Sequence, residues 1–154
     1  MIQRSGSEGW EGVEPLGRHL VFTAKAVREA FEEVLAAAGG SLGTWIVLNA
    51  VSDMGFVSQA VLASHVHLEG ATMTHHVDRL ESLGLVRRQV DADDRRVRRI
   101  ELTPEGERLH GDLLAAAKRF ERVMNKGLSP EDEAALRLAL DRIRSNLEAR
   151  KPPV

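Results

Sequence analysis

The sequence contains no cysteine, and this absence removes several classes of protein at once. A disulfide-stabilised scaffold, a cysteine-ligated zinc or iron–sulfur site and a thiol redox sensor all require that side chain. Aromatic residues make up only 4% of the chain, and none of them is tyrosine. No apolar run approaches the roughly 20 residues of a bilayer-spanning helix, and residues 1–14 lack the apolar centre of a signal peptide. We therefore expect a cytoplasmic protein whose 154 residues form one domain, with or without an added dimerisation element.

The chain has little net charge, with a value of −2, but its charged residues are distributed unevenly. Residues 86–99 contain six arginines and three aspartates, so this segment carries +3 and the remainder of the chain −5. Exposed charges are screened beyond about 8 Å at physiological salt, so local charge matters more than the total. Arginine suits bidentate contacts with phosphates and base edges. The low net charge therefore does not exclude a nucleic-acid partner, although a solvated arginine-rich hairpin is the simpler alternative.

Apolar spacing predicts a mainly α protein with a small antiparallel β-wing. Helical periodicity dominates the chain, a β-type pattern interrupts it once, and Thr103-Pro104 and Ser129-Pro130 are typical helix starts. In chain order, the predicted elements are helices over residues 15–38, 41–53, 58–66 and 71–83, a hairpin over 86–102, and helices over 104–126 and 130–150.

We expect residues 41–103 to form one compact lobe, residues 15–40 and 104–150 a helical dimerisation region, and residues 1–14 a flexible tail. The first helix and the last two are each apolar on one side. Within a single chain, few other elements remain to cover these apolar sides. The last helix shows it as a narrow stripe suited to pairing with another helix, made of Leu136, Leu140, Ile143 and Leu147. A homodimer with a symmetric interface would bury these sides, whereas packing within the chain is the alternative.

Two short helices joined by a glycine-containing turn and followed by a hairpin form the order of a winged helix-turn-helix. In the second of these helices, over 71–83, an apolar stripe consists of Met73, Val77, Leu80 and Leu83. The opposite stripe consists of Thr72, His75, His76 and Arg79. These side chains suit base edges and phosphates in a major groove, and those in the N-terminal half, Thr74 included, are best placed to reach bases. An ordinary amphipathic helix is the alternative, but the cationic hairpin that follows favours DNA.

The stretch over residues 71–106, ATMTHHVDRLESLGLVRRQVDADDRRVRRIELTPEG, resembles the MarR family of bacterial winged helix-turn-helix transcription regulators. The resemblance implies a homodimer on a pseudo-palindromic operator, with helix 71–83 in the major groove and wing 86–102 in the minor groove. It also implies that Arg96 is the wing-tip arginine and that Asp94 orients it. Together with the helix stripe, the predicted DNA-binding residues are Thr72, Thr74, His75, His76, Arg79, Arg88, Asp94, Arg95, Arg96 and Arg98.

This sequence departs from the family at two positions of the helix. Ala71 stands where a base-contacting serine is usual, and His75 where arginine is frequent, which leaves the operator sequence open. Many relatives release DNA when a small aromatic ligand, often phenolic or a carboxylate, enters a cleft between the dimer helices and the DNA-binding lobe. The candidates here are Arg18, His19 and Trp45, because a cation beside an indole can hold an aromatic acid. Otherwise we expect no cofactor, and Trp45 as plain core with Arg18 and His19 on the surface is the alternative.

Three other functions are compatible with parts of the sequence. A metal-responsive regulator of the same fold would use histidines drawn from His65, His67, His75, His76 and His110. A winged-helix module that binds only proteins would share the fold, but the arginines of the wing favour DNA. A hydrolase would use Ser41 in the G-x-S-x-G match at 39–43, but a helix rather than a strand precedes it, so we expect no enzyme.

Overall fold

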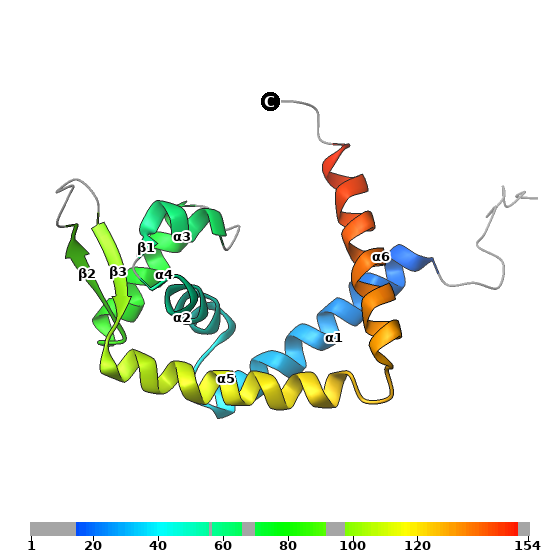
Figure 1. Ribbon diagram of the computed structural model, residues 1–154, viewed down its shortest axis with the longest axis horizontal. Coiled ribbons are helices and arrows are strands. Elements are labelled where there is room, and N and C mark those ends of the chain that lie inside the picture. Colours follow the sequence, from blue (N-terminus) through cyan, green and yellow to red (C-terminus); the bar gives the residue numbers. More distant parts are fainter. Residues whose placement is uncertain (1–14, 56, 66–69, 92–97, 151–154) are drawn as a thin grey trace, which may run out of the picture. The chain divides into compact units, whose positions relative to one another are not determined.

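The computed structural model describes residues 15–55, 57–65, 70–91 and 98–150. The predicted order, mainly helical with one antiparallel hairpin, is confirmed (Figure 1). The elements are α1 (Leu16–Ala37), α2 (Leu42–Met54), β1 (Val57–Ser58), α3 (Gln59–His65), α4 (Gly70–Ser82), β2 (Val86–Val90), β3 (Arg98–Leu102), α5 (Pro104–Met124) and α6 (Pro130–Glu148).

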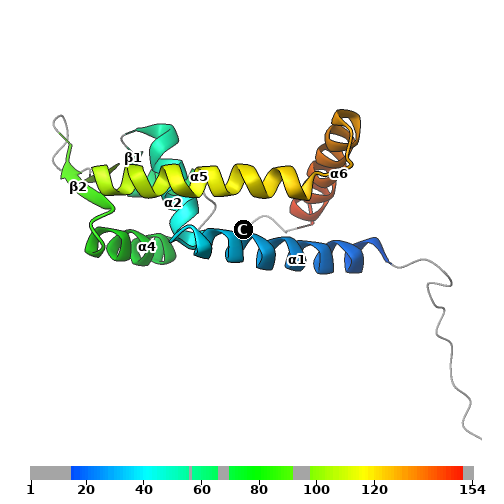
Figure 2. The same cartoon turned by 90° about the horizontal axis from the view of Figure 1, so that it is seen from below.

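The chain forms two compact units, residues 1–117 and residues 118–154. The first unit contains α1 to β3 and most of α5, and the second contains the end of α5 and α6. Within the first unit, α2 extends from the level of α1 and α4 toward that of α5 (Figure 2). No single helix of the described residues is long and apolar enough to cross a membrane; α1 and α2 pass that test only as a pair bent by 76°.

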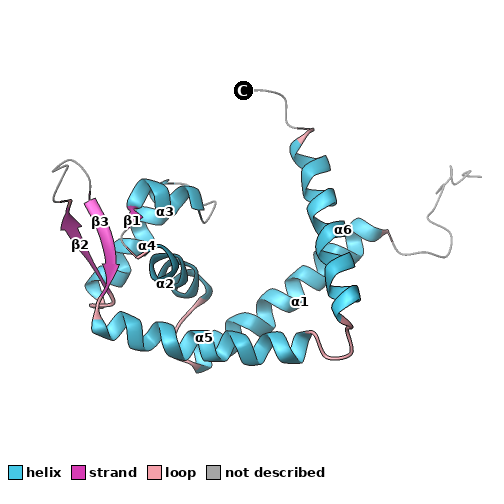
Figure 3. Cartoon of the chain, viewed as in Figure 1, coloured by secondary structure: helices cyan, strands magenta, loops and turns pink. Residues whose placement is uncertain are grey.

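The wing belongs to a three-stranded antiparallel sheet with the order β1-β3-β2 (Figure 3). Strand β2 pairs with β3 from Val86 opposite Leu102 to Val90 opposite Arg98, as the hairpin pattern predicts. Strand β1 adds Val57 opposite Ile100. Its two residues are too few to show an alternating pattern in the sequence, and the prediction did not contain this strand. It anchors the N-terminal end of α3 to the base of the wing.

One apolar core holds the first unit together. From α4 it takes Met73 and Val77, both 0% exposed, and Leu80 at 2%, which confirms most of the predicted stripe. Leu83 does not belong to it, because α4 ends at Ser82 and the following side chain is 57% exposed. The other fully buried large side chains are Leu35, Val47, Leu48, Val51, Leu62, Val86, Ile100 and Leu113. Helix α1 thus contributes to the core through Leu35 near its C-terminal end, and α5 through Leu113 in its first half.

The start of α5 packs directly on the turn between α4 and β2. Thr103 caps the helix, with its hydroxyl oxygen 3.1 Å from the amide nitrogen of Gly106, and donates a 2.6 Å hydrogen bond to the carbonyl oxygen of Gly84. A Cβ at Gly106 would lie 1.9 Å from the carbonyl oxygen of Leu85, so only glycine fits there. Gly84 itself has φ of 69°, in the left-handed region that glycine tolerates. The LTPEG sequence of residues 102–106 is therefore explained by the cap that Thr103 forms on α5 and by the close approach of Gly106 to the backbone of Leu85.

In the second unit, Ser129 and Asp132 form a capping box at the start of α6. The backbone N–H of Ser129 donates to the Asp132 carboxylate at 2.9 Å, and this bond, with the serine side chain, holds the pKa of Asp132 below its usual value. No residue of α6 is buried. Leu136, Leu140 and Leu147 of the predicted stripe are 50%, 42% and 58% exposed.

Candidate nucleic-acid interface

Helix α4 presents two different faces. Opposite the buried stripe of Met73, Val77 and Leu80, the side chains of Thr72, His75 and Arg79 are exposed. Because these polar side chains are exposed, a partner can reach them. The face has the length and the hydrogen-bonding groups that a major groove accepts.

His76 differs from the other residues of the predicted outer stripe. Its ring lies against Gly43 at the start of α2, so closely that a Cβ on Gly43 would be 2.6 Å from Cε1 of the imidazole. The side chain is half-buried. Since a helix advances about 100° per residue, His76 lies only about 60° around the helix from Met73. The structure therefore places His76 between the core and the outer face, in contact with α2.

Arg88 of β2 joins the wing to α4. Its Nη2 lies 2.5 Å from Oδ1 of Asp78, its Nη1 pairs with the Glu81 carboxylate, and its backbone N–H donates to Glu81 at 3.2 Å. Burial would lower the pKa of Arg88, but the hydrogen bonds and charges of Asp78 and Glu81 outweigh it and raise the pKa above its usual value. Only 20% of this side chain is exposed. These contacts hold two parts of the interface together, and the predicted contact of Arg88 with DNA stays a prediction.

Thr74 and Gln59 extend the same network to α3. The side-chain amide of Gln59 donates to Oγ1 of Thr74 at 2.6 Å, and its Oε1 lies 3.4 Å from Nη2 of Arg88. The first residue of α3 is thus fixed to both α4 and β2. Gln59 belongs to no sequence motif. Its role in linking α3 to Arg88 is visible only from the folded structure.

Ion pairs also brace the two strands of the wing. Arg87 pairs with Glu101 across the β2–β3 ladder, and Arg99 pairs with Asp91, whose side chain is 4% exposed. The backbone of Arg98 opens β3 opposite Val90. The predicted contacts Asp94, Arg95 and Arg96 lie outside the described residues, as does the side chain of Arg98.

The predicted ligand residues do not meet within one chain. Trp45 packs in the lobe, stacked on His110 with ring centroids 6.0 Å apart and edge-on to Phe31 at 6.4 Å. Arg18 lies over the Phe22 ring, 5.5 Å from its centroid. Since α1 rises 1.5 Å per residue, Arg18 is about 20 Å along the helix from Phe31 and the Trp45 that it touches. His19 is the next residue of α1, so it is similarly far from Trp45 along the helix.

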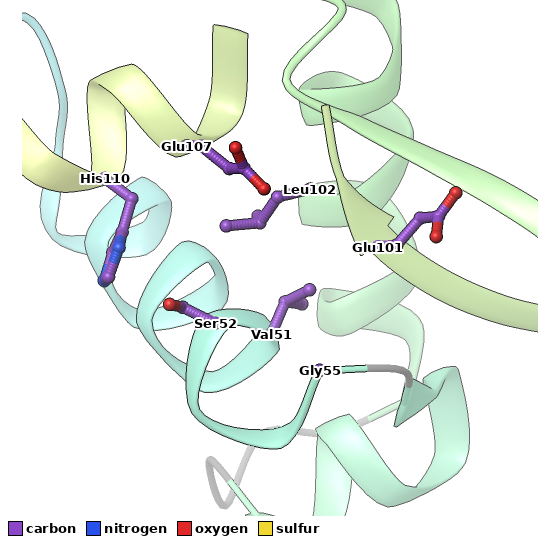
Figure 4. A pocket seen from close by; sticks show the side chains of 7 residues that line it. All are labelled: Val51, Ser52, Gly55, Glu101, Leu102, Glu107 and His110. Atoms are coloured by element: carbon purple, nitrogen blue, oxygen red, sulfur yellow. The ribbon is translucent and has the colours of Figure 1, made fainter. Parts of the chain in front are cut away.

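Two cavities open beside α2 in the first unit. One, of about 410 Å³, lies between α2, β3 and α5, where Glu107 and His110 extend from α5 (Figure 4). His110 there also shares a 3.3 Å hydrogen bond with Asn49. The other, of about 520 Å³, lies between α1, the start of α2 and α4, and includes Arg28 and His76.

The described residues contain no group of three or more metal-ligating side chains. His75 and His76 have ring centroids 6.2 Å apart, and His110 is on another helix against Trp45. His67 and the side chain of His65 lie outside the described residues. A metal site at the predicted histidines therefore has no support from the residues that the structure describes.

Comparison with known proteins gives the family. The model of the MarR family matches residues 40–97, from the start of α2 into the wing. A solved structure of transcriptional regulator PA3341 is 35% identical, with a TM-score of 0.74 over 88% of this chain and 100% of that one. The chain belongs to the MarR family of transcription regulators. The HTH-type transcriptional regulator YsmB of Bacillus subtilis is 25% identical over 92% of this chain and 97% of its own.

Two other MarR-fold structures show the same architecture at lower identity. A mutant MarR from E. coli complexed with operator DNA is 21% identical, with a TM-score of 0.77 over 84% of this chain and 93% of that one. BpsR of Bordetella bronchiseptica, whose DNA binding is regulated by 6-hydroxynicotinic acid, is 23% identical, with a TM-score of 0.74 over 85% and 99%.

MarR family members are transcription regulators and not enzymes, which confirms that prediction for this chain. Ser41, the residue of the G-x-S-x-G match, is the N-cap of α2: its Oγ accepts the N–H of Thr44 at 3.2 Å. Its φ of −144° is extended and unstrained, unlike the sharp turn that holds a hydrolase nucleophile.

Proposed function

We propose that this MarR-family regulator binds a pseudo-palindromic operator as a homodimer, with α4 in the major groove and the arginine-rich wing in the adjacent minor groove. The observation that carries the proposal is the division of α4 into a buried stripe and an exposed face of Thr72, His75 and Arg79. The ion pairs of Arg88 support the proposal, because they fix α4 and the wing relative to each other as one DNA-binding unit. The operator complex of the E. coli relative supports the same partner.

The exposed leucines of α6 support a homodimer. A stripe in which Leu136, Leu140 and Leu147 are all at least 42% exposed is costly in water and needs a partner surface. A second copy supplies the same stripe through a two-fold axis. The DNA-binding lobes of the two protomers would then bind half-sites about 34–36 Å apart, which is one turn of the double helix. A DNA partner places the protein in the cytoplasm.

A small effector molecule completes the proposed function. DNA binding by the related BpsR is regulated by an aromatic acid, and the lobe of this chain has cavities beside the helices that position α4. We expect binding of such a molecule to lower operator affinity. The sign of regulation, repression, follows if the operator overlaps a promoter.

Selection of bound sequences from random duplex DNA with the full chain tests the central proposal. We expect an inverted repeat whose half-sites are one helical turn apart, bound with an affinity that falls steeply with salt. Absence of any enriched motif, or enrichment that survives deletion of the outer face by Thr72→Ala, His75→Ala and Arg79→Ala together, would overturn it. A zinc or nickel requirement for the same enrichment would favour the metal-responsive alternative.

A further inference from the structure

Helix α4 has a third face, between its buried stripe and its outer face. Thr74, Asp78 and Glu81 follow one another at intervals of four and three residues, so they lie within about 60° of each other around the helix. Each has a partner on another element: Gln59 bonds Thr74, and Arg88 pairs with Asp78 and Glu81. Thr74 is exposed and lies in the N-terminal half of α4, the part of a recognition helix that reaches base edges.

We propose that Gln59 of α3 is a specificity-determining residue: it anchors the hydroxyl of Thr74, so that the γ-methyl group of Thr74 meets the major groove and selects thymine. The inference rests on the proposed function, which places α4 in that groove, and it adds a residue from outside the recognition helix. Gln59 acts through Thr74 and is therefore a positioning residue. Thymine is the base that the methyl group favours, because only thymine presents a 5-methyl group there.

The side-chain amide of Gln59 has a defined orientation. Its two polar atoms lie beside Thr74 and Arg88, and the guanidinium of Arg88 has no acceptor atom. Oε1 must therefore face Nη2 of Arg88, at 3.4 Å, which directs Nε2 to Oγ1 of Thr74, at 2.6 Å. Because the amide donates, the threonine oxygen accepts this bond. The bond holds the oxygen on the side of α4 that faces α3.

This hydrogen bond selects one rotamer of Thr74. In a helix, threonine divides its χ1 angle between two staggered positions, and the methyl group takes a different place in each. The bond from Gln59 favours the rotamer that turns Oγ1 toward α3. Since the side chain is exposed, its γ-methyl group is then the part that is left to meet a base. Contact between a threonine methyl group and the methyl group of thymine is an established form of base readout.

Gln59 is itself held in place by its neighbours in the chain. Ser58 pairs with Arg99 in the β1–β3 ladder, and its Oγ accepts the backbone N–H of Val61 at 3.3 Å. Gln59 is half-buried, and Leu62, one turn later on α3, is fully buried in the core. A side chain on such a fixed backbone can position another one, because a supporting residue must have little freedom of its own.

Replacing thymine by uracil in the operator tests the reading of thymine, because the two bases differ only in the 5-methyl group. The operator recovered from random duplex DNA is remade with deoxyuridine at each thymine position in turn, in both half-sites together, and its affinity for the full chain is measured. One buried methyl contact is worth about four-fold in affinity, so at one position the wild type should bind about sixteen-fold more weakly. Thr74→Ser, which keeps the hydroxyl and lacks the methyl group, should show no such loss there.

The role of Gln59 is tested by repeating this comparison with Gln59→Ala. With Thr74 divided equally between two rotamers, the thymine–uracil ratio should fall to about 2.5-fold per half-site, or about six-fold in all. In Thr74→Val a second methyl group replaces the hydroxyl, so the ratio should stay near the wild-type value with or without Gln59→Ala. Asn49→Ala is the matched control. It removes an amide that bonds Asp53 and His110 in the same lobe, so it should leave the ratio unchanged even if it lowers stability.

The rotamer of Thr74 can also be followed without DNA. Three-bond couplings from its methyl carbon to the backbone nitrogen and carbonyl carbon, measured by nuclear magnetic resonance, report χ1 directly. We expect a single rotamer in the wild type and averaged couplings in Gln59→Ala. Averaged couplings in the wild type, or the same single rotamer in both proteins, overturn the anchoring of Thr74 by Gln59.

The outcomes with DNA separate this inference from the proposed function. If the wild type enriches no DNA, the proposed function fails, and the reading of thymine fails with it. The inference alone is overturned if an operator is enriched but no thymine in it responds to uracil, or if every response persists in Thr74→Ser. It is equally overturned if Gln59→Ala keeps the wild-type ratio. If circular dichroism shows Gln59→Ala to be unfolded, Gln59→Met, of the same length and without a donor, takes its place with the same expected ratio.

Discussion

Nη2 of Arg88, on the first strand of the wing, lies 2.5 Å from Oδ1 of Asp78 on the proposed recognition helix. The same guanidinium pairs with Glu81 one turn along α4 and reaches Oε1 of Gln59 on α3. Because one side chain joins three elements, the angle between α4 and the wing is not set by backbone packing alone. Groove recognition by two elements at once requires such a fixed angle.

Replacement of Arg88 by alanine should therefore lower both stability and operator affinity. The side chain is only 20% exposed, and its loss leaves Asp78 and Glu81 facing each other, which we expect to cost about 1–2 kcal/mol of unfolding free energy. Arg88→Lys should restore only part of it, because a single ammonium cannot serve two carboxylates in fork geometry. Denaturant melts and fluorescence anisotropy measure the two effects.

Arg108→Ala is the control for that experiment, since Arg108 is 71% exposed and pairs with Glu105 three residues earlier on the same helix. Its effect on stability should stay within about 0.5 kcal/mol. If Arg88→Ala instead melts like the wild type and merely reduces the salt dependence of DNA binding, Arg88 is a phosphate contact as its sequence position indicated.

His75 and His76 should behave differently although they are neighbours. His75→Ala removes an exposed group from the outer face of α4, so we expect selection from random DNA to return an altered base preference. His76→Ala removes a side chain that lies against Gly43, so the selected motif should stay the same. An unchanged motif for His75→Ala, or a changed one for His76→Ala, contradicts this assignment.

Gly106→Ala should be strongly destabilising. The added Cβ would lie 1.9 Å from the carbonyl oxygen of Leu85, a backbone atom that cannot turn aside, so α5 or the α4–β2 turn must shift. We expect a loss of at least about 3 kcal/mol, at the upper end of single substitutions. Gly111→Ala on the same helix meets nothing within 4 Å and should gain up to about 1 kcal/mol from helix propensity. Equal melting temperatures for the two variants would contradict the close approach.

The sequence was sufficient for the features that depend on local periodicity. Helical spacing predicted the burial of Met73, Val77 and Leu80, and Thr103 before a proline predicted the cap of α5. Features that depend on contacts between distant segments were missed. Arg88 has the residue type of a DNA contact, and only the approach of Asp78 and Glu81 gives it another partner. Helical spacing alone puts His76 on the outer face of α4, whereas in the structure its ring lies against Gly43 of α2.

The exposed stripe of α6 predicts that a polar substitution on it changes the oligomeric state. We expect Leu140→Asp, within the stripe, to shift light scattering from a dimer toward the 17.0 kDa of one chain, because it places a charge in an apolar interface. Arg137→Ala on the same helix is the control and should remain dimeric. A wild-type mass of one chain at micromolar concentration contradicts the dimer directly.

The wing gives the last prediction, which rests on the sequence because Arg96 lies outside the described residues. If Arg96 enters a narrow minor groove, Arg96→Ala should weaken operator binding and reduce the slope of log affinity against log salt by about one unit per lost phosphate-neutralising contact. Arg108→Ala, on α5, should change neither quantity. Since Arg87, Arg88 and Arg99 are already paired with carboxylates, we expect Arg95, Arg96 and Arg98 to supply the charge that DNA meets. An unchanged slope for Arg96→Ala would therefore move the minor-groove contact to Arg95 or Arg98, which the same salt titration on their alanine variants identifies.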